Sequence, residues 1–219
     1  MKSVLISIQP KWVEKICHEI GKDENGKPIY EKRIEVRKTA PKEVPFKAYI
    51  YETYDKKYAD IGICWGNGKC FEHGCKKVIG EFICDKVDEY KFHNGLTEFN
   101  SMGLPSRIYG SYLIFADDYK AMCLSYDEVK TYGNGKTLYG WCISDLKIYD
   151  KPKELSEFRK ACPDKFRYCE ICKYGSVVLS PDEEEYALYH GGHYDCYDTV
   201  CHNIVTRPPQ SWCYVEELQ

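Results

Sequence analysis

The 219-residue chain has no apolar run long enough to cross a membrane. Its start leads directly into a short alternating segment, without the long apolar region and small-residue cleavage site of a secretory signal. We therefore expect a cytoplasmic protein that has no membrane partner. In that compartment the 13 cysteines point to buried thiols or bound metal rather than disulfides, and their odd number agrees with this.

The chain also lacks a large excess of either charge, with a formal net charge of −3 at pH 7. This balance argues against a protein that wraps nucleic acid chiefly through electrostatic attraction. The charges are unevenly distributed, because residues 1–48 carry 11 Lys and Arg against 7 Asp and Glu, which allows a positive working face at this end. Aromatic residues make up 15% of the chain, a composition that favours strands and offers flat surfaces for stacking on bases or sugars.

The stretch from Lys32 to Lys38 places charged residues beside two β-branched residues and reads as a strand. On an extended chain side chains alternate, so one face would carry charge and the other would enter a core. The charged face comprises Arg33, Glu35 and Arg37, and the apolar face comprises Ile34 and Val36. A carboxylate between two guanidiniums suggests a chemical site, whereas the alternative is an edge strand with a solvated polar face.

The spacing of Lys32, Glu35 and Arg37 resembles the Gly-x-Lys-x-x-Glu-x-Arg signature of the ASCH domain, a member of the PUA-like superfamily, of bacterial or phage type. Tyr30 stands where the signature has glycine, and an insertion over Lys22–Glu31 explains the difference. Three further segments are similar to the opening strand with first helix and to the barrel strands of that family. These are Ser7–Ile16, Phe46–Thr53 and Val78–Asp85.

This resemblance implies an α+β fold, a PUA-like mixed β-barrel with flanking short helices and a Cys-rich C-terminal insertion before the last strand. We expect the barrel over residues 1–160, the Cys/His-rich insertion over 161–206, and a closing strand of the barrel over 207–219. The resemblance also implies that RNA or a modified, nucleotide-like ligand binds in a cleft beside the first helix, with the signature residues near its floor.

The side chains expected to contact the ligand come from the signature, from the strand after it and from the C-terminal segment. They are Lys32, Glu35, Arg37, Lys38, Tyr51, Arg207, Gln210 and Ser211. Guanidinium and ammonium groups suit phosphate or carbonyl oxygens, and a carboxylate accepts from an amino group. In the C-terminal segment two prolines stiffen the backbone, so that polar groups there can read a base edge or a phosphate.

An enzymatic alternative stays open. In small ASCH amidohydrolases a threonine nucleophile lies at the position of Glu35, and a carboxylate cannot replace an activated hydroxyl. Glu35 or Glu81 could instead act as a general base on water, with Lys32 as electrostatic helper, in an amidohydrolase- or ribonuclease-like reaction. Glu81 has apolar neighbours in the sequence, so its carboxylate either faces the pocket or pairs with a basic side chain such as that of Arg37. A third hypothesis is a protein-interaction module of a phage or mobile element.

The segment after residue 160 is rich in cysteine and histidine. Two residues separate Cys169 from Cys172, a spacing that lets both thiolates reach one tetrahedral zinc ion. The remaining ligands would come from Cys162, Cys196, Cys201 or a histidine. Structural zinc is therefore the one cofactor the sequence suggests, and the alternative is a set of free thiols.

Local patterns predict several further elements. Pro10 opens a helix with an apolar stripe that reaches Ile20, and Asn25-Gly26 predicts a hairpin turn. Ser125 and Glu128 form a capping box at the start of a helix. The other predictions are strands at 46–53, 77–85 and 137–149, a short helix at 152–160 and a last strand around 212–215, with 86–123 unassigned.

Overall fold

The computed structural model describes residues 2–58, 62–64, 70–72, 76–94, 109–160 and 204–218. The candidate zinc ligands Cys162, Cys169, Cys172, Cys196 and Cys201 lie outside these ranges. Within the described ranges, no helix is both long and apolar enough to span a membrane.

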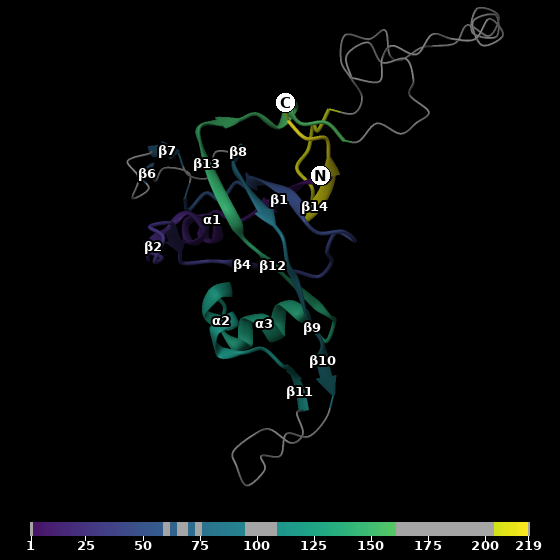
Figure 1. The fold of residues 1–219 in the computed structure, drawn as a ribbon. Helices are drawn as coiled ribbons and strands as arrows, with labels where there is room; N and C mark the ends of the chain where they lie inside the picture. Colours follow the sequence, from purple (N-terminus) through teal and green to yellow (C-terminus); the bar gives the residue numbers. More distant parts are fainter. Residues whose placement is uncertain are drawn as a thin grey trace, which may run out of the picture.

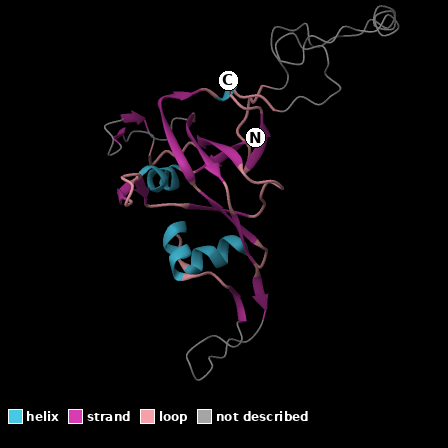
Figure 2. Ribbon diagram, viewed as in Figure 1, coloured by secondary structure: helices cyan, strands magenta, loops and turns pink. Residues whose placement is uncertain are grey.

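Strands outnumber helices in the described chain, and two groups of short helices accompany them (Figure 1, Figure 2). The elements in chain order are β1 Lys2–Ile8, α1 Pro10–Cys17, β2 Glu19–Lys22, β3 Pro28–Tyr30, β4 Ile34–Arg37, β5 Phe46–Glu52, β6 Gly62–Cys64, β7 Cys70–Glu72, β8 Val78–Cys84, β9 Val87–Tyr90, β10 Phe92–Asn94, β11 Tyr109–Tyr112, α2 Ala116–Met122, α3 Tyr126–Gly133, β12 Leu138–Cys142, β13 Ser144–Lys153, the 3₁₀ turn η1 Leu155–Glu157 and β14 Trp212–Val215. This composition confirms the predicted α+β class.

A five-stranded sheet forms the centre, with the order β13-β8-β5-β1-β14. β1 and β5 run parallel, and every other pair in this sheet is antiparallel. The connection between β1 and β5 therefore crosses over, and it carries α1, the β2–β3 hairpin and β4. A second sheet has the order β4-β12-β9. These two sheets remain separate among the described residues, so they do not close into one continuous barrel.

The two sheets are joined by chain continuity and by packing. β12 passes into β13 with a single residue between them, and Trp141 on β12 is fully buried. Its ring lies 5.0 Å from that of Phe46 on β5, edge to face. Edge-to-face contacts of this kind add to the burial energy of both rings. The cluster around this contact also receives α1, through Val13 and Ile16.

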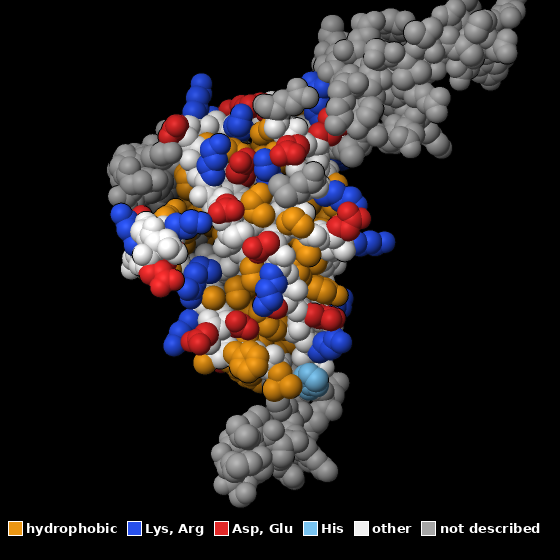
Figure 3. Space-filling model, in the orientation of Figure 1, with side chains coloured by type: hydrophobic (Ala, Val, Ile, Leu, Met, Phe, Trp, Pro, Cys, Tyr) orange, Lys and Arg blue, Asp and Glu red, His pale blue; other side chains and the backbone are white. Residues whose placement is uncertain are grey.

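Two further apolar clusters cover the outer faces. On the side of the central sheet opposite α1, Tyr49 and Tyr51 pack with Phe158 and Val205. On the second sheet, Met122 and other side chains of α2 and α3 pack over β4 and β12. α2 and α3 lie together against that sheet in Figure 1. On the surface shown in Figure 3, acidic and basic side chains are interspersed, as expected for a nearly neutral chain.

Several local predictions are confirmed. The inserted segment is a hairpin in which Gly26 takes a φ of 77°, a left-handed conformation that glycine adopts without strain. The Asp23 carboxylate accepts from two amides of that turn, at Asn25 and Lys27. The capping box at Ser125 is present, and α3 ends where Asn134 turns left-handed.

Other predictions were wrong. The first helix ends at Cys17, and Ile20 belongs to β2 with 56% of its surface exposed. The strand predicted over 137–149 divides at Ile143 into β12 and β13, which belong to different sheets. The only helical turn in residues 152–160 is η1, because β13 continues through Pro152 to Lys153. A proline is tolerated there since β13 is an edge strand.

We expect Ser125→Ala to lower the free energy of unfolding by about 1 kcal/mol, since an N-cap oxygen satisfies an otherwise unpaired helix amide. The Glu128 carboxylate accepts from the backbone amide and hydroxyl of Ser125, which holds the pKa of Glu128 below its usual range. The contribution of ionised Glu128 to the stability of the folded protein is therefore present at neutral pH and is lost as pH falls through its lowered pKa. Urea denaturation at pH 7 and pH 3 measures both effects. A Ser125→Ala variant as stable as wild type at pH 7 would contradict this assignment.

Candidate functional site

A cavity of about 970 Å³ opens between the two sheets, α1 and α3. Five segments of the chain line it. Its lining residues are Ser7, Ile8, Gln9, Lys11 and Trp12, then Lys32, Glu35, Val36 and Arg37, then Thr53, then Leu124, Asp127, Glu128, Thr131 and Tyr132, and finally Pro208, Pro209, Gln210 and Ser211. The volume is in the upper part of the range of small-molecule sites, which is about 300–1,000 Å³.

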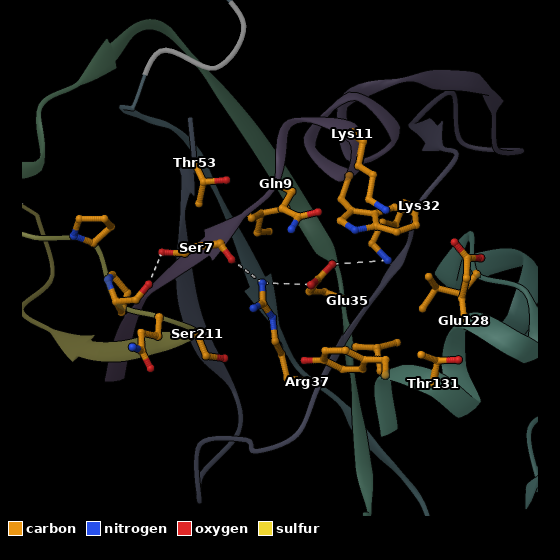
Figure 4. Close-up of a pocket in the computed structure, with 18 of the residues that line it drawn as sticks. Ser7, Gln9, Lys11, Lys32, Glu35, Arg37, Thr53, Glu128, Thr131 and Ser211 are labelled. Carbon is orange, nitrogen blue, oxygen red and sulfur yellow. Dashed lines mark hydrogen bonds and ion pairs between the residues drawn. The ribbon is translucent and has the colours of Figure 1, made fainter. Parts of the chain in front are cut away.

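The floor of the cavity is a buried row of charges, Lys32, Glu35 and Arg37 (Figure 4). The Glu35 carboxylate lies 3.4 Å from Lys32 Nζ through Oε2 and 3.0 Å from Arg37 Nη2 through Oε1. All three residues are less than a tenth exposed. Charges buried this deeply require partners, and here each cation is held by the same carboxylate.

Lys32 is held by contacts within the protein itself. Besides Glu35, its ammonium donates to the carbonyl oxygens of Ile34 at 2.9 Å and of Met122 at 2.6 Å. Burial lowers the pKa of Lys32, and Glu35 acts in the opposite direction. Two of its three donors therefore meet carbonyl oxygens, and Glu35 is an ion-pair partner whose Oε2 accepts no hydrogen bond from the described residues. Lys32 joins the end of α2 to β4 and positions Glu35 in the floor of the cavity.

Arg37 connects the floor to one wall. Its Nη2 donates to the backbone oxygen of Ser7 at 2.7 Å, and the Ser7 hydroxyl donates to the backbone oxygen of Pro209 at 2.6 Å. The backbone amide of Ser7 donates to Ser211. The C-terminal segment is thereby fixed beside β1. Two buried atoms in the floor, Glu35 Oε2 and Arg37 Nε, make no hydrogen bond to any described residue.

Two aromatic side chains line the cavity above this floor. Trp12 is partly buried, and the ammonium groups of Lys11 and Lys32 lie 4.3 Å and 5.2 Å from its ring centroid. Tyr132 is 39% exposed, and its pKa is raised by burial. Rings in such positions are suited to stacking on a flat ligand.

The α3 wall was not identified from the sequence as part of the site. Asp127, Glu128, Thr131 and Tyr132 recur at helical spacing, so they share one face of α3. The spacing alone could have predicted this shared face. It could not have predicted that the face turns toward the signature strand, because that depends on packing between distant segments.

The structure brings Lys32, Glu35 and Arg37 together with Gln210 and Ser211 around one cavity. It places the other candidates elsewhere. Lys38 is exposed at the end of β4, with its ammonium 5.1 Å from the Tyr132 ring centroid. Tyr51 is buried in the cluster on the far side of the central sheet. Arg207 is exposed and does not line the cavity.

Glu81 has a basic partner as predicted, but this partner is Lys47 and not Arg37. Glu81 lies on β8 and accepts a hydrogen bond of 2.6 Å from the Tyr149 hydroxyl, with Lys47 at 3.9 Å. The neighbouring carboxylate adds to burial in raising the pKa of Tyr149. The partners of Arg37 are instead Glu35 and the backbone of Ser7. The signature strand therefore supplies its own counter-ion, two residues away.

No group of metal-binding side chains occurs in the part of the chain that the structure describes. Cys17, Cys84, Cys123, Cys142 and Cys213 are free thiols, of which Cys17 and Cys84 are buried. Burial raises the pKa of Cys84 to about 12, so this thiol stays protonated. The zinc site predicted after residue 160 remains a prediction.

No protein-family model and no curated protein sequence matches this chain. Solved structures of the ASCH protein of Zymomonas mobilis and of two of its single-residue variants are similar to it. They are 13–14% identical, have TM-scores of 0.38–0.39, and are matched over 86% of this chain and 94–98% of theirs. Similarity at this level does not establish a shared family, so the site has to be interpreted from its own geometry.

Proposed function

We propose that this chain is an ASCH-like domain that binds RNA or a nucleotide-like ligand in the cavity above Lys32, Glu35 and Arg37. The supporting observation is the buried charge row at the floor of a 970 Å³ cavity that also has aromatic walls. The ASCH signature implied a cleft beside the first helix, and this cavity lies beside α1. The Glu35–Arg37 pair offers an acceptor next to a donor, which suits the edge of a base.

The same geometry favours binding over hydrolysis. A general base needs a carboxylate that is free to take a proton from water. Glu35 is held by two cations, and Glu81 lies outside the cavity with a hydrogen bond from Tyr149. Thr53 and Thr131 bring hydroxyl groups to the cavity lining. The Ser7 hydroxyl also lines the cavity, but it already donates to the backbone oxygen of Pro209. We therefore place binding before an amidohydrolase- or ribonuclease-like reaction.

Trp12 gives a direct test, because it is the one described tryptophan that lines the cavity. We expect a short single-stranded RNA, the four ribonucleosides or their monophosphates to quench tryptophan fluorescence. Trp12→Ala should remove most of this signal and weaken binding about tenfold, since stacking of one base contributes about 1–3 kcal/mol. Calorimetry gives the affinity independently of fluorescence. Release of product during the same incubations would favour the hydrolase alternative.

The matched control is Trp212→Phe. Trp212 packs against Trp141 at 5.7 Å between ring centroids, and its indole donates to Thr39, so it lies away from the cavity lining. This variant should keep both the quenching and the affinity. Absence of binding to every probe by the wild-type protein would refute the proposed function.

A further inference from the structure

Charge is distributed unevenly around the cavity. On the α3 side the lining includes two carboxylates, Asp127 and Glu128. In the floor the Glu35 carboxylate stands between two cations. On the α1 side the lining residues from 7 to 12 include no acid, and Lys11 contributes an ammonium group. An anionic group on a ligand would therefore be favoured beside Lys11 and α1 and disfavoured beside the carboxylates of α3.

The start of α1 strengthens this polarity. Gln9 is the N-cap residue and makes no side-chain capping bond, and Pro10 follows at the first helical position. Amides in the first turn of a helix have no intrahelical acceptor in the usual pattern, and the helix dipole places partial positive charge there. Trp12 and Val13 direct their amides to the Gln9 carbonyl. The backbone amide of Lys11 remains as a donor at this end of the cavity.

A second feature points to a ligand at the same end. Arg37 is only 8% exposed, and its Nε makes no hydrogen bond to any residue in the described ranges. The guanidinium points toward Ser7, just before α1, and Nη2 donates to the Ser7 backbone oxygen (Figure 4). A buried donor without a partner costs about 1–3 kcal/mol, which a bound acceptor would recover.

Lys11 can bring its ammonium group to an anionic ligand. Its side chain is exposed, and the ammonium rests 4.3 Å from the Trp12 ring centroid. No carboxylate in the described ranges lies within ion-pair distance of it, although its charge adds to the hydrogen bonds of Ser125 in lowering the pKa of Glu128. A lysine on a flexible stem can leave an aromatic face for a phosphate at little cost.

We propose that the ligand carries a phosphate group, which binds at the α1 end of the cavity to Lys11 and the start of α1. Its flat, uncharged part then lies between Trp12 and Tyr132, over Glu35 in the floor. This inference rests on the proposed function and adds to it a phosphate requirement and an orientation. The chemical class of the ligand is accordingly a nucleotide or an RNA strand rather than a free nucleoside.

The test compares each ribonucleoside with its 3′- and 5′-monophosphates by calorimetry at low salt. Wild-type protein should bind at least one monophosphate about tenfold or more tightly than the nucleoside, since hydrogen bonds to charged groups are the stronger kind. Lys11→Ala should remove most of that difference by weakening monophosphate binding more than nucleoside binding. Lys11→Arg should restore it. Lys22→Ala is the matched control, because Lys22 is exposed on the β2–β3 hairpin outside the cavity.

The outcomes separate the two proposals. Equal affinity for nucleoside and monophosphate would overturn the phosphate inference and leave the proposed function standing. A phosphate preference that survives Lys11→Ala would overturn the placement at α1. Inorganic phosphate that binds as tightly as the best monophosphate would show a plain anion site and would also overturn the inference. Failure of nucleosides, monophosphates and short RNA alike would refute the proposed function itself.

Discussion

Lys32→Met is expected to lower the free energy of unfolding by about 3 kcal/mol, because removing one partner of a buried ion pair leaves the other charge uncompensated. Lys32 is 2% exposed, and its ammonium holds Glu35 as well as the carbonyl oxygens of Ile34 and Met122. Methionine fills a similar volume without any donor. Arg37 remains beside Glu35 in the variant, which places our estimate at the lower end of the range for broken buried pairs.

A double-mutant cycle tests this assignment by urea denaturation. Glu35→Gln removes the negative charge while keeping an oxygen that can accept from Arg37. The double variant Lys32→Met/Glu35→Gln should therefore be more stable than the two single effects would predict by addition. Lys38→Met is the matched control, because Lys38 is exposed six residues further along, and it should stay within about 0.5 kcal/mol of wild type. A Lys32→Met variant as stable as this control would contradict the structural role of Lys32.

The difference in unfolding free energy between wild type and Lys32→Met should depend on pH in one direction. Burial lowers the pKa of Lys32 from its ordinary value of 10.5. Between the folded and unfolded pKa values the unfolded chain binds more protons, so this lysine makes stability rise with pH there. Lys32→Met lacks the group. The difference in unfolding free energy between wild type and variant should therefore widen as pH rises toward 10.5, and a narrowing would contradict the direction of the shift.

Elements with strong local signals could be predicted from the sequence. The capping box at Ser125, the Asn25-Gly26 turn, the alternating apolar residues of β5 and the β-branched residues of β8 are all signals between residues close in the sequence. Residues 86–123 had no such signal, and they form β9, β10, β11 and α2. These elements are short, and their partners are distant: β9 pairs with β12, some 50 residues later. Tertiary packing decides such segments more than local propensity does.

For the site, too, the sequence predicted what depends on nearby residues and missed what depends on distant ones. Lys32, Glu35 and Arg37 follow from one strand with a signature spacing, and the structure places all three in one cavity. The roles within the row were not predictable. The acceptor that engages Lys32 lies at Met122, 90 residues away, and the contact that fixes Ser7 lies at Pro209, 202 residues away. Alternation in an extended strand shows which side chains share a face, and it cannot show what the rest of the chain places opposite them.

These distant contacts give the three signature residues different tasks. Lys32 and the Ser7–Pro209 bond are internal to the protein, so their changes should be read first as changes in stability. Arg37 is different because its Nε has no acceptor among the described residues while its side chain lines the cavity. Its Nε is therefore a buried donor that a bound ligand would satisfy.

Arg37→Met is expected to weaken RNA or nucleotide binding by about 100-fold, since truncating one member of a buried charged contact costs about 2–5 kcal/mol. Part of the loss would come from Glu35, which keeps Lys32 but loses its second partner. Arg37→Lys separates the two effects: an ammonium can still pair with Glu35, but it lacks the planar fork and the Nε donor. We expect this variant to unfold nearly as wild type does and to bind at least about tenfold more weakly.

Arg207→Met supplies the matched control for this measurement. Arg207 belongs to the C-terminal segment beside the cavity, yet it is exposed and does not contribute to the lining. Sequence reasoning expected it to contact the ligand, and the geometry predicts affinity close to that of wild type after its replacement. Calorimetry on folded variants, checked by circular dichroism, decides between the two. Full affinity in Arg37→Lys and Arg37→Met together with a large loss in Arg207→Met would move the binding site out of the cavity and onto the surface beside it.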